Sequence, residues 1–200
     1  MVNKKSIALY SIPAILLGVI MVFAFAYSAT PATLTNSNPS VSSDDIQTTI
    51  NYHANVCTSV RRVDGSIQSL GCSHNLLMDA GRNAIKNELG VGGTVAAFNY
   101  IALCNAALGC PAPAVSDTTL SNEFATNGLT RALGTYTSLA GNGNWSIAKT
   151  FTATADNVVT NKTGLFNQST TGTMLAENTF TTVTLMTNDQ LTINWTITVT

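Results

Sequence analysis

Charge is scarce in this sequence. Of its 200 residues, 9 are Lys or Arg and 10 are Asp or Glu, so the formal net charge is −1. The chain has no basic patch that would follow a phosphate backbone and no acidic tail that would collect cations. We therefore do not expect nucleic acid as a partner.

The sequence also lacks the motifs of familiar catalytic chemistry. His53 and His74 are its only histidines. It contains no G-x-S-x-G elbow, H-E-x-x-H helix, phosphate-binding loop or dinucleotide fingerprint. The glycines of residues 90–93 follow a predicted helix rather than precede one, unlike a phosphate cradle. With no convergent nucleophile, base or metal set, we expect a protein that is not an enzyme and that binds no cofactor.

Alternation of apolar and polar residues is what the sequence has in abundance. In residues 191–199, large apolar side chains occupy every odd position and Thr or Asn every even one, which predicts a half-buried β-strand. Further strands are predicted at about 66–73, 100–103, 129–139, 145–154, 162–167, 173–179 and 180–186. Many short strands separated by Gly, Asn, Asp and Ser predict a mainly β fold, a β-sandwich of jelly-roll or immunoglobulin-like type.

Two segments with helical character interrupt the strand pattern. Apolar residues at helical spacing in residues 76–89 predict one helix of about four turns, which Gly90 ends. A short helical turn is expected near 117–124.

The N-terminus has the pattern of an export signal. Lys4 and Lys5 precede an uncharged, largely apolar run over residues 6–29, with small residues toward its end. Residues 1–29 are therefore predicted to be a signal peptide or, because about 20 apolar residues span a bilayer, a retained signal anchor. Residues 30–45, rich in Thr, Ser, Asn and Pro, are predicted to be a flexible linker before a sandwich domain over 46–200. We expect an extracellular, cell-surface protein that contacts a membrane only through an uncleaved leader.

The four cysteines predict two disulfide bonds, because even counts in exported chains favour disulfides. Asp64-Gly65 is typical of a two-residue hairpin turn. Such a turn places Cys57 directly opposite Cys72. Cys104 and Cys110 would close a small loop.

A metal site is the alternative interpretation for part of this set. His74 lies two residues from Cys72 on the same strand face, and His53 lies four residues from Cys57. Two thiolates and two imidazoles would suit zinc or copper. The spacing matches no familiar ligand pattern, so we prefer the disulfides.

The polar faces of the strands carry N-glycosylation sequons. Four exist, at Asn144, Asn161, Asn167 and Asn194. Asn144 and Asn194 fall on the face opposite the apolar side chains of their strands, where a glycan can stand. We therefore predict N-linked glycans.

Lys149 interrupts the apolar face of the strand predicted at 145–154. The simpler interpretation is a side chain near a sheet edge whose ammonium group reaches water. The alternative is an isopeptide crosslink to a neighbouring Asn, because a lysine is rarely buried without a partner.

The first strand is unusually long. Its alternation runs from Ile46 to Val60, about 50 Å of extended chain, whereas strands usually have about five or six residues. We expect residues 46–52 to reach beyond their own domain, with Ile46, Thr48, Ile50 and Tyr52 as donor-strand residues. A bulge near 51–55 is the alternative. The outer edge of the last strand is the expected acceptor.

These features together resemble the subunits of archaeal extracellular filaments, the threads and bundling pili. The resemblance rests on the leader, the polar linker, the long first strand and the Thr-rich sandwich with its sequons. It implies head-to-tail assembly of identical subunits by donor-strand complementation, in which an N-terminal segment fills a groove in the next subunit. It also implies adhesion to other cells or surfaces. A monomeric anchored surface adhesin is an alternative.

A second resemblance covers about residues 75–200. Stretches 99–103, 116–123, 164–167 and 172–176 are similar to segments of uncharacterised phage structural proteins. This resemblance implies a virus- or phage-derived structural protein. A virion part assembled in the cytoplasm would need neither the leader nor the cysteines, so the filament interpretation is preferred.

Overall fold

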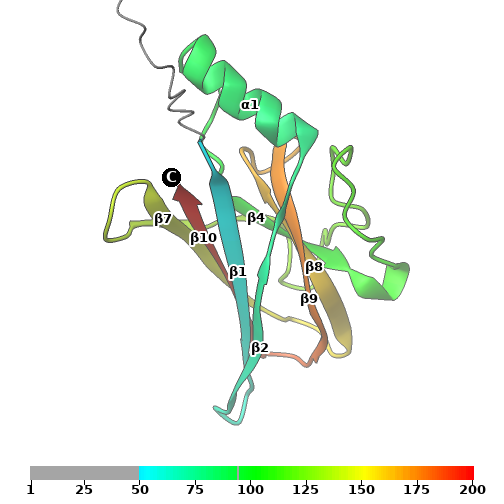
Figure 1. Ribbon diagram of the computed structural model, residues 1–200. Helices are drawn as coiled ribbons and strands as arrows, with labels where there is room; N and C mark the ends of the chain where they lie inside the picture. Colours follow the sequence, from blue (N-terminus) through cyan, green and yellow to red (C-terminus); the bar gives the residue numbers. More distant parts are fainter. Residues whose placement is uncertain (1–49, 94) are drawn as a thin grey trace, which may run out of the picture. The chain divides into compact units, whose positions relative to one another are not determined.

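The structure, a computed structural model, describes residues 50–93 and 95–200. The predicted leader (1–29), linker (30–45) and donor-strand residues Ile46 and Thr48 lie outside the described residues. The described part contains two antiparallel β-sheets and one α-helix (Figure 1). The prediction of a mainly β, sandwich-like fold with one helix is confirmed.

Each sheet has five strands. Sheet A contains, in spatial order, β2 (Ile67–His74), β1 (Tyr52–Arg61), β10 (Gln190–Val199), β7 (Asn144–Thr152) and β6 (Thr135–Ser138). Sheet B contains β3 (Leu76–Leu77), β9 (Met174–Leu185), β8 (Val158–Phe166), β4 (Tyr100–Asn105) and β5 (Ala132–Leu133). Helix α1 (Asp79–Gly90) lies at the end of the sheets where β1 begins and β10 ends (Figure 1), and the short 3₁₀-helix η1 (Ala106–Leu108) follows β4.

The main core lies between the two sheets. The alternation seen in the sequence decides which side chains face it, because successive side chains of a strand point to opposite faces. β10 contributes Leu191, Ile193, Trp195 and Ile197, all fully or almost fully buried. Ala54, Val56 and Val60 of β1 face the same core. Burial of each such large apolar side chain stabilises the fold by roughly 1.5–3 kcal/mol.

A second, smaller core lies on the other face of sheet B. Its buried members are Met78, Ala102, Cys104, Leu120, Phe166 and Met174. Phe166 alternates with Leu165, which belongs to the main core, so the two cores occupy opposite faces of β8. The chain between β4 and β5 covers this second face. Arg131 fixes that covering segment, because its guanidinium lies 3.5 Å from the Phe166 ring centre and donates to Glu123.

Several predicted elements differ from the observed ones. The strand predicted at 129–139 forms two short strands in different sheets, β5 and β6. The helix has 12 residues, about three turns, because Leu76 and Leu77 form β3 by pairing with Glu177 and Ala176. The strands predicted at 173–179 and 180–186 form the single strand β9. No helical turn forms near 117–124, where Asn122 and Phe124 instead make backbone hydrogen bonds with β4.

The prediction that the last strand offers a free edge is wrong. β10 lies in the middle of sheet A and pairs with β1 on one side and with β7 on the other. The edges of sheet A are β2 and β6. Strand order depends on contacts between distant segments, which the local alternation does not encode.

Candidate functional site

Both predicted disulfides are present. Cys57–Cys72 joins β1 to β2, and Cys104–Cys110 closes the loop after β4. The sulfurs of Cys57 and Cys72 are consumed in the disulfide and are not available as metal ligands. Within residues 50–93 and 95–200, no group of three or more His, Cys, Asp or Glu side chains is arranged to hold a metal.

The four sequon asparagines differ in accessibility. Asn144, Asn161 and Asn194 are half-buried strand residues. Asn167 is only 8% exposed, and its Oδ1 accepts a hydrogen bond from Thr173 N at 2.7 Å. Asn167 is therefore the least accessible of the four to a glycosylating enzyme, and the glycans stay a prediction.

The predicted donor segment meets the domain at Ile50. Tyr52 pairs with Val199 in sheet A, and Asn51 and Thr200 exchange two backbone hydrogen bonds of 2.6 and 3.0 Å. Tyr52 therefore belongs to the chain's own sheet. Ile50 directly precedes this pairing and is 66% exposed.

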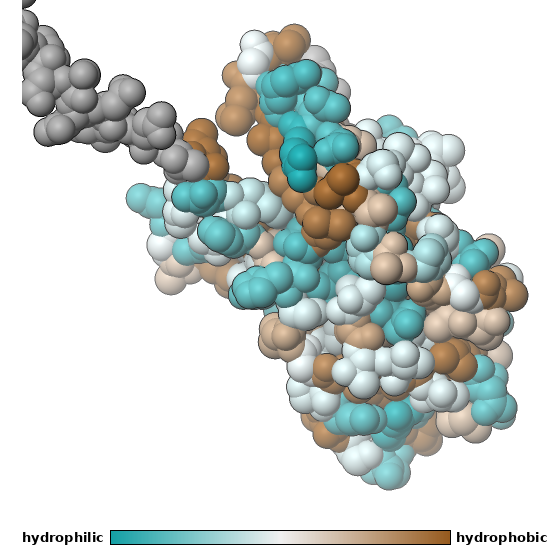
Figure 2. Space-filling model, turned by 45° about the vertical axis from the view of Figure 1, so that its right-hand side comes forward, coloured by the Kyte–Doolittle hydropathy of each residue, from teal (hydrophilic) through white to brown (hydrophobic). Residues whose placement is uncertain are grey.

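An apolar groove opens beside Ile50, between sheet A and helix α1. Its volume is about 670 Å³. The residues that line it come mostly from strands of both sheets, from α1 and from the loop before β4: Ile50, Tyr52, Ile85, Leu89, Ala97, Phe98, Asn99, Tyr136, Trp145, Ile147, Leu175, Ile197 and Val199. We call this feature the α1 groove. Figure 2 shows hydrophobic, brown surface along α1 and at the point where the described chain begins.

The groove exists because α1 lies over the end of sheet A, but its side chains do not fill the space between helix and sheet. Ile197 and Val199 continue the inward-facing row of β10 to the very end of the strand. The helix supplies Ile85 and Leu89 to the opposite wall, but Leu89 is 73% exposed. Ile197 itself is buried, but Ile50 and Leu89 remain accessible at this end.

Among the described residues, the lining of the groove contains no Asp, Glu, His, Lys or Arg. Its polar side-chain groups are the Asn99 amide, the hydroxyls of Tyr52 and Tyr136 and the indole N–H of Trp145. Burial raises the pKa of the Tyr52 hydroxyl well above its ordinary value, and the hydrogen bond from Asn75 only partly opposes this, so Tyr52 is neutral at physiological pH. Such a lining suits uncharged, apolar side chains.

Strand β6 places an open sheet edge next to the groove. β6 pairs only with β7 in the described part of the chain, and all four of its residues are exposed. Its Tyr136 is also part of the groove lining. Unpaired N–H and C=O groups along an edge are a template for another strand.

The opposite edge strand of sheet A, β2, is hydrogen-bonded to sheet B. Asn178 of β9 donates to His74 O at 2.9 Å and to Ser73 Oγ at 3.0 Å, which links β2 to sheet B. The sandwich is thus fastened on the β2 side and open on the β6 side.

Sequence reasoning did not anticipate the α1 groove or the open edge of β6, and the donor strand stays a prediction. Trp145 and Ile147 lie on the predicted inward face of their strand, yet nothing local shows that their end of the sheet is left uncovered. In the described part of the chain, no helix is both long and apolar enough to cross a bilayer. No protein-family model matches the sequence, and no curated protein matches it.

Proposed function

We propose that this chain is an exported structural subunit of a cell-surface filament that assembles by donor-strand complementation. One observation carries the proposal: the uncharged α1 groove lies beside the open edge of β6. A groove of this kind, next to an unpaired edge, fits an extended segment that adds a strand and inserts alternate side chains. The two disulfides are in keeping with an oxidising, extracellular setting.

The proposed occupant is residues 41–50 of a neighbouring copy. This segment alternates Ile46, Thr48 and Ile50 on one face, and a ten-residue extended strand measures about 33 Å. The apolar knobs would enter the α1 groove, and the main chain would pair with β6. Asp44 and Asp45 precede the knobs and would remain in water, because the groove offers them no cation.

The direction of exchange decides between a filament and a closed dimer. The donor segment joins the domain at Ile50, on the rim of the same groove that accepts a donor. Reciprocal exchange between two copies would close a dimer, whereas passing the segment to a third copy gives an open chain. We propose that the segment passes to a third copy, which gives the open chain.

Deletion of residues 30–49 tests the proposal. The deletion ends before Asn51 and Tyr52, so the pairing of β1 with β10 is kept. We expect the variant to keep its circular dichroism and both disulfides but to form no filaments in electron micrographs of material sheared from cells. A variant with residues 30–40 replaced by a Gly/Ser linker of equal length is the matched control and should still polymerise.

A peptide of residues 41–50 provides the second arm of the test. We expect it to bind the truncated domain and to change the fluorescence of Trp145, which lines the groove. The same peptide with Ile46 and Ile50 replaced by Asp should not bind. Filaments that persist without residues 30–49 would overturn the proposal, and a full-length chain that stops at a dimer would overturn the open-chain assembly.

A further inference from the structure

Sheet B contains a fully buried lysine that pairs with a fully buried glutamate. Lys162 of β8 and Glu177 of β9 have no exposed side-chain surface, and Lys162 Nζ lies 2.5 Å from Glu177 Oε2. Lys162 pairs with Thr179, and Glu177 pairs with Gly164. The two residues are therefore diagonal neighbours on the same face of adjacent strands.

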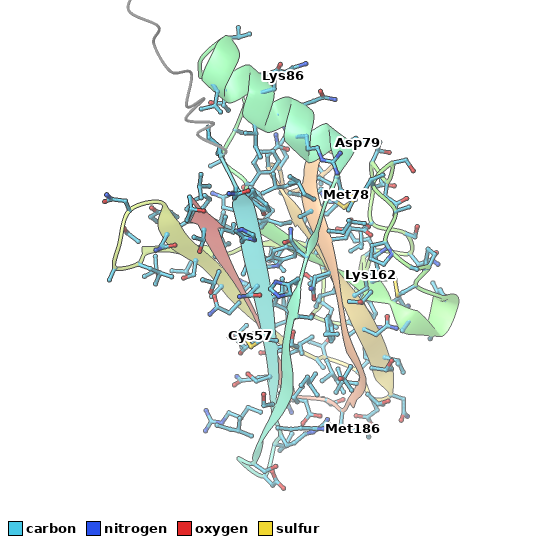
Figure 3. All side chains as sticks on the ribbon, viewed as in Figure 1. Cys57, Met78, Asp79, Lys86, Lys162 and Met186 are labelled. Carbon is cyan, nitrogen blue, oxygen red and sulfur yellow. A yellow bond between two sulfur atoms is a disulfide. The ribbon has the colours of Figure 1, made fainter. Side chains whose placement is uncertain are left out.

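The pair lies on the second face of sheet B, beneath the segment that follows β4. Lys162 Nζ also donates to Pro111 O at 3.2 Å, in that covering segment. Figure 3 labels the Lys162 side chain. Neither carboxylate oxygen of Glu177 makes a hydrogen bond of regular geometry within the described residues. Asp117, from the same covering segment, is the other carboxyl that acts on Glu177.

This environment disfavours two separated charges. Removing an ammonium and a carboxylate from water costs several kcal/mol for each ion, and attraction offsets this only where further hydrogen bonds satisfy both groups. Burial raises the pKa of Glu177, Lys162 opposes the rise, and Asp117 adds to it. The raised pKa of Glu177 favours its neutral carboxylic acid, the form that can condense with an amine.

We propose that Lys162 and Glu177 form an intramolecular amide crosslink between Nζ and Cδ. The neutral amine attacks the Glu177 carboxyl carbon, and the new N–C bond forms as one C–O bond breaks. The departing oxygen takes one proton from the acid and one from the amine and leaves as water. Nothing is oxidised or reduced, and no co-reactant is needed.

Amide formation is accelerated by the fixed position of the two groups and by proton transfer. Two groups held in contact react with effective molarities that reach about 10⁵ M or more in well-oriented cases. Because Asp117 is the other carboxyl that acts on Glu177, we assign to it the transfer of the proton from the attacking nitrogen to the leaving oxygen, the role of a general acid–base residue. The exclusion of water from the site favours the amide over its hydrolysis.

The crosslink would join β8 to β9 covalently and remove both buried charges. It would hold the second face of sheet B together when the molecule is pulled. This inference does not depend on the groove or on polymerisation, so either proposal can fail without the other.

A tryptic digest of the chain tests the crosslink directly. Residues 150–200 contain Lys162 as their only Lys or Arg, and they contain no cysteine. The chain should be produced in a host without N-glycosylation, because three sequons fall in this region. Without a crosslink, trypsin releases peptides 150–162 and 163–200. With it, we expect one product, 150–200, lighter than its sequence by one water molecule and resistant to Glu-specific cleavage after Glu177.

Three variants sharpen the result. Lys162→Arg keeps the charge and the trypsin site but cannot form the amide, so it should release the two separate peptides. Lys149→Arg is the matched control on a half-buried lysine and should leave the 150–200 product unchanged. Asp117→Asn should slow the appearance of that product after refolding by tenfold or more, and an unchanged rate would remove Asp117 from the reaction. Full release of 150–162 and 163–200 from the wild-type chain would overturn the proposal, whether or not any variant folds.

Discussion

At the scale of single residues, Asp189 holds two distant turns together. Its side chain is buried and accepts hydrogen bonds from Arg62 Nη1 at 2.8 Å, Val63 N at 3.2 Å and Met186 N at 2.9 Å. Arg62 and Val63 belong to the β1–β2 connection, and Met186 belongs to the β9–β10 connection. One carboxylate thus joins the hairpin to the opposite sheet at the end of the sandwich far from α1.

These contacts make the stability of the domain depend on pH. Burial by itself would raise the pKa of Asp189, but the hydrogen bonds from Met186, Arg62 and Val63 outweigh it and hold the pKa below its ordinary value. The unfolded chain therefore binds the proton more tightly than the folded one. The stabilisation from Asp189 is complete above the unfolded pKa of about 3.9 and is lost as the pH falls through the lower, folded pKa.

Substitution of Asp189 by Asn tests this dependence. We expect Asp189→Asn to lower the free energy of unfolding near neutral pH by about 2 kcal/mol, because hydrogen bonds to a charged group are lost. The variant should also show a flatter loss of stability in acid. Urea denaturation followed at several pH values measures both. Asp156→Asn is the control, since Asp156 accepts hydrogen bonds from Thr187 but is solvent-exposed, and its effect should be smaller.

At the scale of elements, the β1–β2 hairpin shows how a correct prediction can rest on a wrong detail. A two-residue turn at Asp64-Gly65 was expected to align Cys57 with Cys72. The observed loop has three residues, because Arg62 N bonds to Ser66 O and Arg61 pairs with Ile67. A register shift between Thr58 and Ser59 then restores the Cys57–Cys72 pairing. The extra residue in the turn shifts the register by one position, and the bulge shifts it back by one.

Strands and their inward faces could be predicted from the sequence because burial of one face imposes a period of two. Strand order, sheet edges and the α1 groove could not, because they depend on contacts between distant segments. The buried lysine was also missed. A register shift between Thr160 and Lys162 of β8 turns Lys162 to the second face, and the local sequence pattern does not reveal that shift. Lys149, the lysine that the sequence pattern placed on the inward face, pairs with Ile193 of β10 and is half-buried.

The two disulfides should differ in their contribution to stability. A disulfide stabilises a fold mainly by restricting the unfolded chain, and longer loops gain more. Cys57–Cys72 spans a sequence separation of 15 and Cys104–Cys110 one of 6. We expect Cys57→Ala with Cys72→Ala to lower the free energy of unfolding by about 3 kcal/mol, and the other pair by about 2 kcal/mol. Thermal and urea unfolding of both double variants measure the difference, and the reverse order would contradict this loop-length argument.

At the scale of the whole molecule, the open features gather at one end of the sandwich. β1 begins there, α1 lies there, and β6, which pairs only with β7 among the described residues, borders the groove. The opposite end is closed by the Asp189 contacts. This asymmetry is what a subunit needs if it is to bind a neighbour without exposing its core.

Two leucines of nearly equal exposure, one inside the groove and one outside it, allow the role of the groove to be tested. Leu89 of α1 lines the groove and is 73% exposed, whereas Leu108 of η1 is 69% exposed and is not part of the lining. Substitution of either by Glu should change the free energy of unfolding by about 0.5 kcal/mol or less, as for most surface positions.

Assembly should respond very differently to the two changes. Leu89→Glu places a charge at a site that an apolar knob must enter, so we expect it to weaken binding of the 41–50 peptide by tenfold or more, about 1.4 kcal/mol. The same variant should shorten or abolish filaments in sheared material. Leu108→Glu should bind the peptide and polymerise as the wild type does. Fluorescence titration and electron microscopy of both variants measure this contrast. Equal behaviour of the two variants would mean that the α1 groove is not the acceptor.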